Sequence, residues 1–188
     1  MKKAVAITTG LLILSTAAWT VLYLQSGAGT CFTLAVTFGT ISYHFSMRLA
    51  VGADINAWMN NKADYTRGWF RPRKWEEKLY QVLRVKEWKG KLPTFSPEAF
   101  DFEKKSLEEI AQAMCQSEVV HEVIFVLNFL PIFASVWVGA LPVFAITSLL
   151  ASIMELACIV AQRYNRPRIV RLLERQERQN CRRKENTK

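Results

Sequence analysis

Residues 123–154 read "VIFVLNFLPIFASVWVGALPVFAITSLLASIM" and contain no charged side chain. A helix needs about 20 apolar residues to cross a lipid bilayer, so this stretch is long enough for two partial crossings. Near its middle, residues 139–142 read "GALP", and glycine with proline is typical of a turn. The stretch therefore predicts two membrane helices, at residues 119–138 and 142–162, joined by that turn.

Two more apolar stretches precede it. Residues 4–24, "AVAITTGLLILSTAAWTVLYL", carry no charge, and residues 30–47 carry only a histidine. A cleaved signal peptide, starting with "MKK" and ending at "SGA", is the alternative for the first stretch, but the apolar run exceeds the usual length of about 7–15 residues. We therefore expect crossings at 4–24 and 31–51. The predicted fold class is an all-α integral membrane protein with four transmembrane helices in one domain, residues 1–188.

The positions of the basic residues predict the orientation. Residues 62–91 contain ten Lys or Arg against four Asp or Glu, and the tail, residues 163–188, contains ten against three. The short loops at 25–29 and 139–141 carry no charge. Because an excess of Lys and Arg marks the cytoplasmic side, we expect both termini and the loop 52–118 to be cytoplasmic, in a cell membrane.

The net charge of +9 is mostly explained by this topology. The basic residues flank predicted spans and no nucleic-acid recognition motif is present, so the predicted partner is the lipid bilayer and not nucleic acid. The four cysteines form no CxxC pair, which gives no sign of a disulfide framework or a zinc finger.

The middle loop is too long to be without structure. Within "WFRPRKWEEKLYQVLRVKEWKGKLP" (69–93), an apolar helical face is formed by Trp75, Leu79, Val82 and Leu83, and basic residues flank it. Such a basic amphipathic helix is typical of the membrane interface, although it could instead pack on the protein itself.

A second helix is predicted after this segment. Ser106 and Glu109 have the spacing of a capping box. We expect a long helix from residue 107 that enters the bilayer near residue 119, with a kink at Pro131.

Ionisable residues accompany the spans. His44, His121 and Glu155 are all predicted in the cytoplasmic half of the bilayer, where such residues usually face the bundle interior and mark function. Glu118 and His121 are three residues apart and share a helical face, which Asn128 continues. A carboxylate beside an imidazole can fix its tautomer and raise its basicity, so Glu118 and His121 are the predicted catalytic pair.

Two other interpretations of these residues remain open. In one, Glu118 and Glu122 belong to the hydrated part of the helix, and His121 only makes a hydrogen bond to a neighbour. In the other, Glu-x-x-His is half of a di-metal motif and His44, Glu118, His121 and Glu155 bind a metal; the second copy of that motif is missing, so we predict no metal site.

The tail begins with "QRYNRPR", residues 162–168. Guanidinium groups bind phosphate in a bidentate manner, so Arg163, Arg166 and Arg168 are candidates for binding a phosphate-bearing substrate. The alternative is that they bind anionic lipid headgroups at the end of the last span.

The segments "EVVH", "WKGKLP" and "QRYNRPR" together resemble the glycosyl-4,4'-diaponeurosporenoate acyltransferase family, over roughly residues 69–180. The resemblance implies a small integral membrane enzyme of carotenoid biosynthesis. Such enzymes esterify the sugar of a glycosylated C30 carotenoid acid with a fatty acyl chain, the last step to staphyloxanthin-type pigments. The roles of Glu118 and His121 are inferred from their chemistry, not from the resemblance.

The resulting hypothesis is a membrane acyltransferase that acts on a sugar hydroxyl of a glycosylated carotenoid or a related glycolipid. The expected partners are the lipid-linked sugar acceptor and an acyl donor, for which acyl-CoA is expected, with no bound cofactor. GxSxG is absent, which favours direct transfer over a covalent acyl-enzyme. The predicted substrate-binding residues are His44, Trp75, Tyr80, Trp88, Lys89, Asn128, Glu155, Arg163, Tyr164, Asn165, Arg166 and Arg168.

Two alternatives belong to other classes. One is a non-catalytic four-helix membrane scaffold or lipid-binding protein, and the other is a metal-dependent membrane lipid enzyme. The sequence specifies no oligomeric state.

Overall fold

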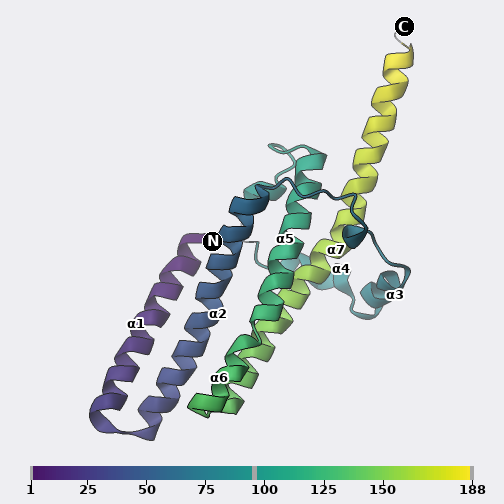
Figure 1. Cartoon of the computed structure of the whole chain (residues 1–188). Coiled ribbons are helices and arrows are strands. Elements are labelled where there is room, and N and C mark those ends of the chain that lie inside the picture. Colours follow the sequence, from purple (N-terminus) through teal and green to yellow (C-terminus); the bar gives the residue numbers. More distant parts are fainter. Residues whose placement is uncertain (1, 95–96, 187–188) are drawn as a thin grey trace. The chain divides into compact units, whose positions relative to one another are not determined.

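The computed structural model of the chain describes residues 2–94 and 97–186, and these residues form helices without a strand (Figure 1). This confirms the predicted all-α class. The α-helices are α1 (Lys2–Ser26), α2 (Gly29–Met59), α3 (Lys74–Val82), α4 (Val85–Trp88), α5 (Leu107–Leu127), α6 (Leu130–Val138) and α7 (Leu141–Asn186). Short 3-10 turns are η1 (Gly68–Phe70), η2 (Lys89–Lys91) and η3 (Pro97–Phe100).

The chain divides into two compact units. Unit 1 contains Met1–Asp54 and Val120–Leu156, and unit 2 contains Ile55–Val119 and Ala157–Lys188. Each boundary falls inside a helix, so α2, α5 and α7 contribute residues to both units. Each unit is described by itself below.

Within the described ranges, three helical stretches are long and apolar enough to cross a membrane: Lys3–Ser26, Leu107–Val138 and Leu141–Glu185. The predicted second crossing, residues 31–51, lies in α2, which is long enough but too polar to qualify. The physical reason is visible in unit 1, where Thr40, Ser42 and His44 of α2 are all buried. Polar residues on the inner face of a helix lower its average hydropathy without meeting lipid.

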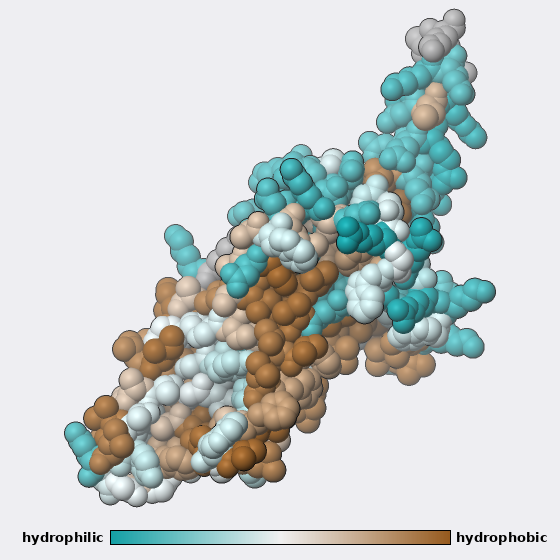
Figure 2. All heavy atoms as spheres, viewed as in Figure 1, coloured by the Kyte–Doolittle hydropathy of each residue, from teal (hydrophilic) through white to brown (hydrophobic). Residues whose placement is uncertain are grey.

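The outward faces of the apolar helices carry large exposed side chains. Leu11, Leu14 and Leu24 of α1 are each at least 60% exposed, and Val136 and Trp137 of α6 are about 80% exposed. Apolar atoms cover much of the helical surface, whereas the C-terminal part of α7 is hydrophilic (Figure 2). Exposed apolar area on this scale is unusual for a protein surrounded by water and is expected for one surrounded by lipid.

The predicted turn between the last two apolar helices is confirmed. Gly139 and Ala140 both have positive φ, +73° and +52°, and α7 begins at Leu141. Glycine adopts this left-handed region without steric cost, which explains why the chain reverses here.

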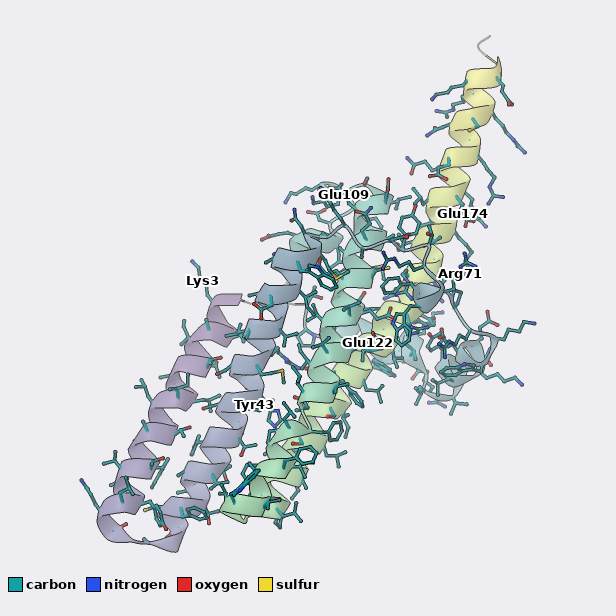
Figure 3. The ribbon with its side chains drawn as sticks, in the orientation of Figure 1. Lys3, Tyr43, Arg71, Glu109, Glu122 and Glu174 are labelled. Atoms are coloured by element: carbon teal, nitrogen blue, oxygen red, sulfur yellow. The ribbon has the colours of Figure 1, made fainter. Side chains whose placement is uncertain are left out.

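The expected continuous helix at 107–138 is interrupted between Leu127 and Leu130. Pro131 causes the break because it has no N–H to donate to the carbonyl of Leu127. That carbonyl instead accepts a hydrogen bond of 3.0 Å from the Tyr43 hydroxyl of α2. Tyr43 points from α2 to this break (Figure 3), and the proline therefore fixes a contact between two helices of unit 1.

The capping box at the start of α5 is confirmed. The Ser106 hydroxyl accepts a hydrogen bond from the Glu109 N–H at 3.2 Å, and a Glu109 carboxylate oxygen accepts from the Ser106 N–H at 2.9 Å. We expect Ser106→Ala to lower the free energy of unfolding by about 1 kcal/mol, because an N–H at the helix start loses its acceptor. Denaturant unfolding in detergent measures this, with Ser15→Ala as control, since that hydroxyl donates to the Leu11 carbonyl of its own helix.

The remaining helices differ from expectation mainly at their ends. The amphipathic helix predicted within residues 69–93 is present as α3, but it stops at Val82 because Arg84 adopts a left-handed conformation, with φ of +48°. The basic tail continues α7 and is helical as far as Asn186.

Candidate functional site

The predicted site residues are divided between the two units. His121, Glu155, His44 and Asn128 belong to unit 1. Glu118 and the arginines of the "QRYNRPR" segment belong to unit 2, as do the residues of α3 and α4.

The group in unit 1 is centred on Glu155 of α7, whose side chain is 1% exposed. One carboxylate oxygen lies 2.5 Å from Nδ1 of His121 in α5, and the other forms an ion pair with Arg48 of α2. A buried carboxylate is stable only when its charge is paired and its oxygens are hydrogen-bonded, and both conditions hold here. Three helices thus position one imidazole.

The tautomer of His121 follows from this contact. The carboxylate of Glu155 accepts, so Nδ1 carries the proton and Nε2 holds the free lone pair. The His121 side chain is 22% exposed, so the ring is mostly enclosed but accessible. An imidazole held in one tautomer by a buried carboxylate is the arrangement of a general base.

A second polar pair in unit 1 joins α2 to the end of α5. Nδ1 of His44 lies 2.9 Å from the side-chain oxygen of Asn128, and both side chains are more than nine-tenths buried. His44 and Asn128, both predicted to bind substrate, are therefore brought together by the structure.

Glu118 has partners other than the one predicted. Its two carboxylate oxygens are bound by Arg163, at 2.6 Å, and by Arg166. Glu118 is completely buried and Arg166 is 2% exposed. The spacing along α5 suggested that Glu118 orients His121, but the structure gives that position to Glu155 and places Glu118 in a buried ion-pair network.

Glu76 of α3 extends this network. Arg163 also contacts a Glu76 oxygen at 2.7 Å, and the Tyr80 hydroxyl donates to the other Glu76 oxygen at 2.8 Å. Burial, followed by the hydrogen bond to Glu76, raises the pKa of Tyr80 above its ordinary value. Tyr80 therefore stays protonated and acts as a hydrogen-bond donor.

The same arginines fix the loop before α3. Arg166 donates to the Phe70 carbonyl at 2.6 Å, and Arg163 donates to the Trp69 carbonyl at 3.3 Å. Arg71 lies beside α7 in this unit (Figure 3). The guanidinium groups of Arg163 and Arg166 are bound by carboxylates and carbonyls of the protein itself. The first role of these two arginines is therefore to stabilise the fold of unit 2, not to bind a substrate.

Lys89, Tyr164 and Arg168 form a third cluster, also in unit 2. Arg168 lies 4.1 Å from the centre of the Tyr164 ring and donates to its hydroxyl at 2.6 Å. Lys89 lies 4.8 Å from the same ring and donates to the side chain of Asn165. Burial, and then the charge of Arg168, lowers the pKa of Lys89, as expected when two cations share a small region.

A groove of about 1630 Å³ runs along this part of unit 2, between α3 and α7. Tyr164 and Arg168 line it, and its lining includes eight Lys or Arg and five Glu. The excess of positive charge favours an anionic ligand. We call this the basic groove.

The polar side of α3 faces inward, through Glu76 and Tyr80, and its apolar side faces outward. Trp75 is 56% exposed and Val82 is 81% exposed. This orientation favours the membrane interface over self-packing for the predicted apolar face. Trp88 of α4, another predicted substrate-binding residue, instead donates to the Leu83 carbonyl at 2.8 Å.

Glu76, Ser148 and Ser152 were not predicted from the sequence to belong to a site, and Arg48 was expected only as an ionisable residue near the second crossing. Arg48 is one helical turn after His44, and Ser148, Ser152 and Glu155 share one face of α7, which is a detectable signal. No sequence pattern indicated that Glu76 is buried, since its neighbours are typical of an exposed helix. Among the residues that the structure describes, no three His, Cys, Asp or Glu side chains gather as metal ligands.

Comparison with known proteins gave one family. The family model described as glycosyl-4,4'-diaponeurosporenoate acyltransferase matches residues 66–175, which is more than half of the chain. The matched part contains His121, Glu155 and all of the described ion-pair network in unit 2, but not His44 or Arg48. No curated protein and no solved structure matches the chain.

Proposed function

Because the chain belongs to the glycosyl-4,4'-diaponeurosporenoate acyltransferase family, we propose that it moves a fatty acyl group from acyl-CoA to a sugar hydroxyl of a glycosylated carotenoid. Membership makes it an acyltransferase of carotenoid biosynthesis. The observation that supports the chemistry is the pairing of His121 with buried Glu155, because acylation of an alcohol needs a base that takes the hydroxyl proton.

The proposed step is direct transfer. Nε2 of His121 takes the proton as the hydroxyl oxygen attacks the thioester carbonyl carbon, which gives a tetrahedral intermediate. The carbon–sulfur bond then breaks, and the thiolate receives the proton from the imidazolium. Glu155 keeps the imidazole in the required tautomer and stabilises its positive charge, while Arg48 holds Glu155 in place.

We further propose that Lys89 and Arg168 bind the phosphates of the donor. Two cations placed around one tyrosine ring repel each other, and an anion between them would relieve that repulsion. Arg163 and Arg166, which the sequence also suggested for this task, already have carboxylate partners.

For Lys89→Gln and Arg168→Gln, we expect KM for acyl-CoA to rise by roughly tenfold or more, because a hydrogen bond to a charged group contributes about 1.5–3 kcal/mol. A donor without phosphate, such as an acyl-N-acetylcysteamine thioester, is expected to show the same KM with both variants and with the wild type. Steady-state kinetics with the two donors measures the difference.

Arg175→Gln is the matched control, since it removes one positive charge from an exposed position of α7 that does not line the basic groove. Equal effects of Arg168→Gln on both donors would contradict a role in phosphate binding.

For the membrane topology, we propose four crossings with both termini and the loop 52–118 on the cytoplasmic side of the cell membrane. Three helical stretches are long and apolar enough to cross a membrane, and the buried polar face of α2 supports a fourth crossing of lower hydropathy. The apolar face of α3 would lie in the interface.

The reaction is tested with the full-length protein purified in detergent. Radiolabelled palmitoyl-CoA and a glycosylated C30 carotenoid acid are supplied, and an acylated sugar ester is identified by mass spectrometry. Release of CoA without that product, or no turnover with any glycolipid acceptor, would contradict the proposal.

A further inference from the structure

Four buried polar atoms of unit 1 have no hydrogen-bond partner among the described residues: His44 Nε2, Asn128 Nδ2, Ser148 Oγ and Ser152 Oγ. Their side chains belong to residues that are at most 8% exposed. A buried polar atom without a partner destabilises a folded protein, and native proteins contain few such atoms. Four such atoms in one unit therefore indicate a place where a bound polar group would supply the missing hydrogen bonds.

The four atoms lie within about one helical turn of one another along the helix axes. His121 of α5 contacts Glu155 of α7, and these helices run in opposite directions. Asn128, seven residues after His121, therefore lies level with Ser148, seven residues before Glu155. His44 is hydrogen-bonded to Asn128. Ser148 and Ser152 share the face of α7 that carries Glu155, about 5–10 Å from it along the axis. We call these four residues the polar layer.

The free atoms of the polar layer include both donors and acceptors. The Asn128 oxygen accepts from His44 Nδ1, so His44 Nε2 is left as an acceptor. Asn128 Nδ2 can only donate, and the serine hydroxyls can do both. A carbonyl or a phosphate oxygen cannot donate to His44 Nε2, whereas a hydroxyl can donate to it and accept from Asn128.

We propose that the polar layer binds neighbouring hydroxyl groups of a sugar and thereby places the acceptor next to His121. This inference rests on the proposed function, in which a sugar hydroxyl is the nucleophile. It assigns Ser148 and Ser152 a role in recognising the acceptor. It also explains why α7 carries two hydroxyls without hydrogen-bond partners on the face that carries Glu155.

The test measures sugar binding without turnover. The full-length protein is purified in octaethylene glycol monododecyl ether, a detergent without sugar, and its thermal midpoint is followed while n-octyl β-D-glucoside or an octyl chain with a diethylene glycol head is added. The variant is Ser148→Ala combined with Ser152→Ala. The control is Thr147→Val on the same helix, because the Thr147 hydroxyl is already bonded to the Val143 carbonyl.

We expect the glucoside to stabilise the wild type and Thr147→Val more than the glycol does. The double serine variant is expected to bind the glucoside roughly tenfold more weakly, from the loss of two hydrogen bonds. Without glucoside it is expected to be at least as stable as the wild type, because two unsatisfied hydroxyls are gone. If the double variant does not fold, Ser148→Ala alone is compared in the same way.

An equal response to glucoside and glycol would overturn the proposal. An unchanged glucoside affinity in the double serine variant would also overturn it. If that variant is less stable than the wild type but binds the glucoside equally well, the polar layer holds only water. If the wild-type protein responds to the glucoside as expected but shows no acyl transfer, the sugar site is supported and only the proposed reaction is contradicted.

Discussion

Replacement of His121 by alanine is expected to lower kcat for acyl transfer by about 10²–10⁴-fold, which is the usual contribution of a general base. The imidazole is the group that takes the hydroxyl proton, and alanine leaves nothing in its place. The measurement is the initial rate of acyl transfer by purified protein in detergent, with folding checked by circular dichroism and by the thermal midpoint.

Glu155 acts through His121, so its variants separate positioning from general loss of structure. Glu155→Gln is expected to lower kcat by about 10²–10⁴-fold with little change in KM, because an amide can donate to Nδ1 and stabilise the wrong tautomer. Glu155→Asp keeps the charge and is expected to recover part of the rate. A purely structural role would not distinguish the two variants in this way.

Glu122→Gln is the matched control for this series, since it removes a carboxylate from the residue after His121, in the same helix (Figure 3). It is expected to keep a rate close to that of the wild type. Wild-type turnover by a well-folded His121→Ala protein would exclude the base mechanism.

Glu118→Gln is expected to act on stability, with a loss of about 3–5 kcal/mol in the free energy of unfolding. Glu118 is completely buried and its oxygens face two guanidinium groups, so removal of its charge leaves Arg166 buried without an ionic partner. Denaturant unfolding in detergent measures the change. The large size follows from burial, because solvent does not screen this network.

A combined variant tests the pairing itself. Glu118→Leu with Arg166→Met removes both charges, and it is expected to be more stable than either single variant. The exposed pair Arg178 and Glu174 is the control, and Arg178→Gln is expected to change stability by no more than about 0.5 kcal/mol. A Glu118→Gln protein with wild-type stability and no activity would instead return Glu118 to the catalytic site.

The helices could be predicted from sequence because their causes are local. The capping box at Ser106 and the turn at Gly139 each act within a few residues, and both were confirmed. Apolar length acts within one helix of about 20 residues, and three of the four predicted crossings are apolar enough by this criterion. The polar inner face of α2 was harder to interpret, because average hydropathy does not distinguish a polar side chain that meets another helix from one that meets lipid.

The partners of the ionisable residues could not be predicted in the same way. Spacing along α5 placed Glu118 beside His121, but the contacts of both residues are made with α7, which begins after them in the chain. The choice between Glu118 and Glu155 depends on the register of two helices, and no local pattern sets that register. Glu76 illustrates the same limit, since only the packing of α3 on α7 reveals that it is buried.

The network around Glu118 also sets an order for biogenesis. Its arginine partners follow it by 45 and 48 residues, so the ribosome completes α5 well before either positive charge exists. Until then the carboxylate must stay hydrated or be held by the insertion machinery, because an isolated buried charge is unstable. Unit 2 therefore completes its assembly only after the last helix has been made, and a chain that ends before Arg166 is expected to be recognised by membrane quality control and degraded.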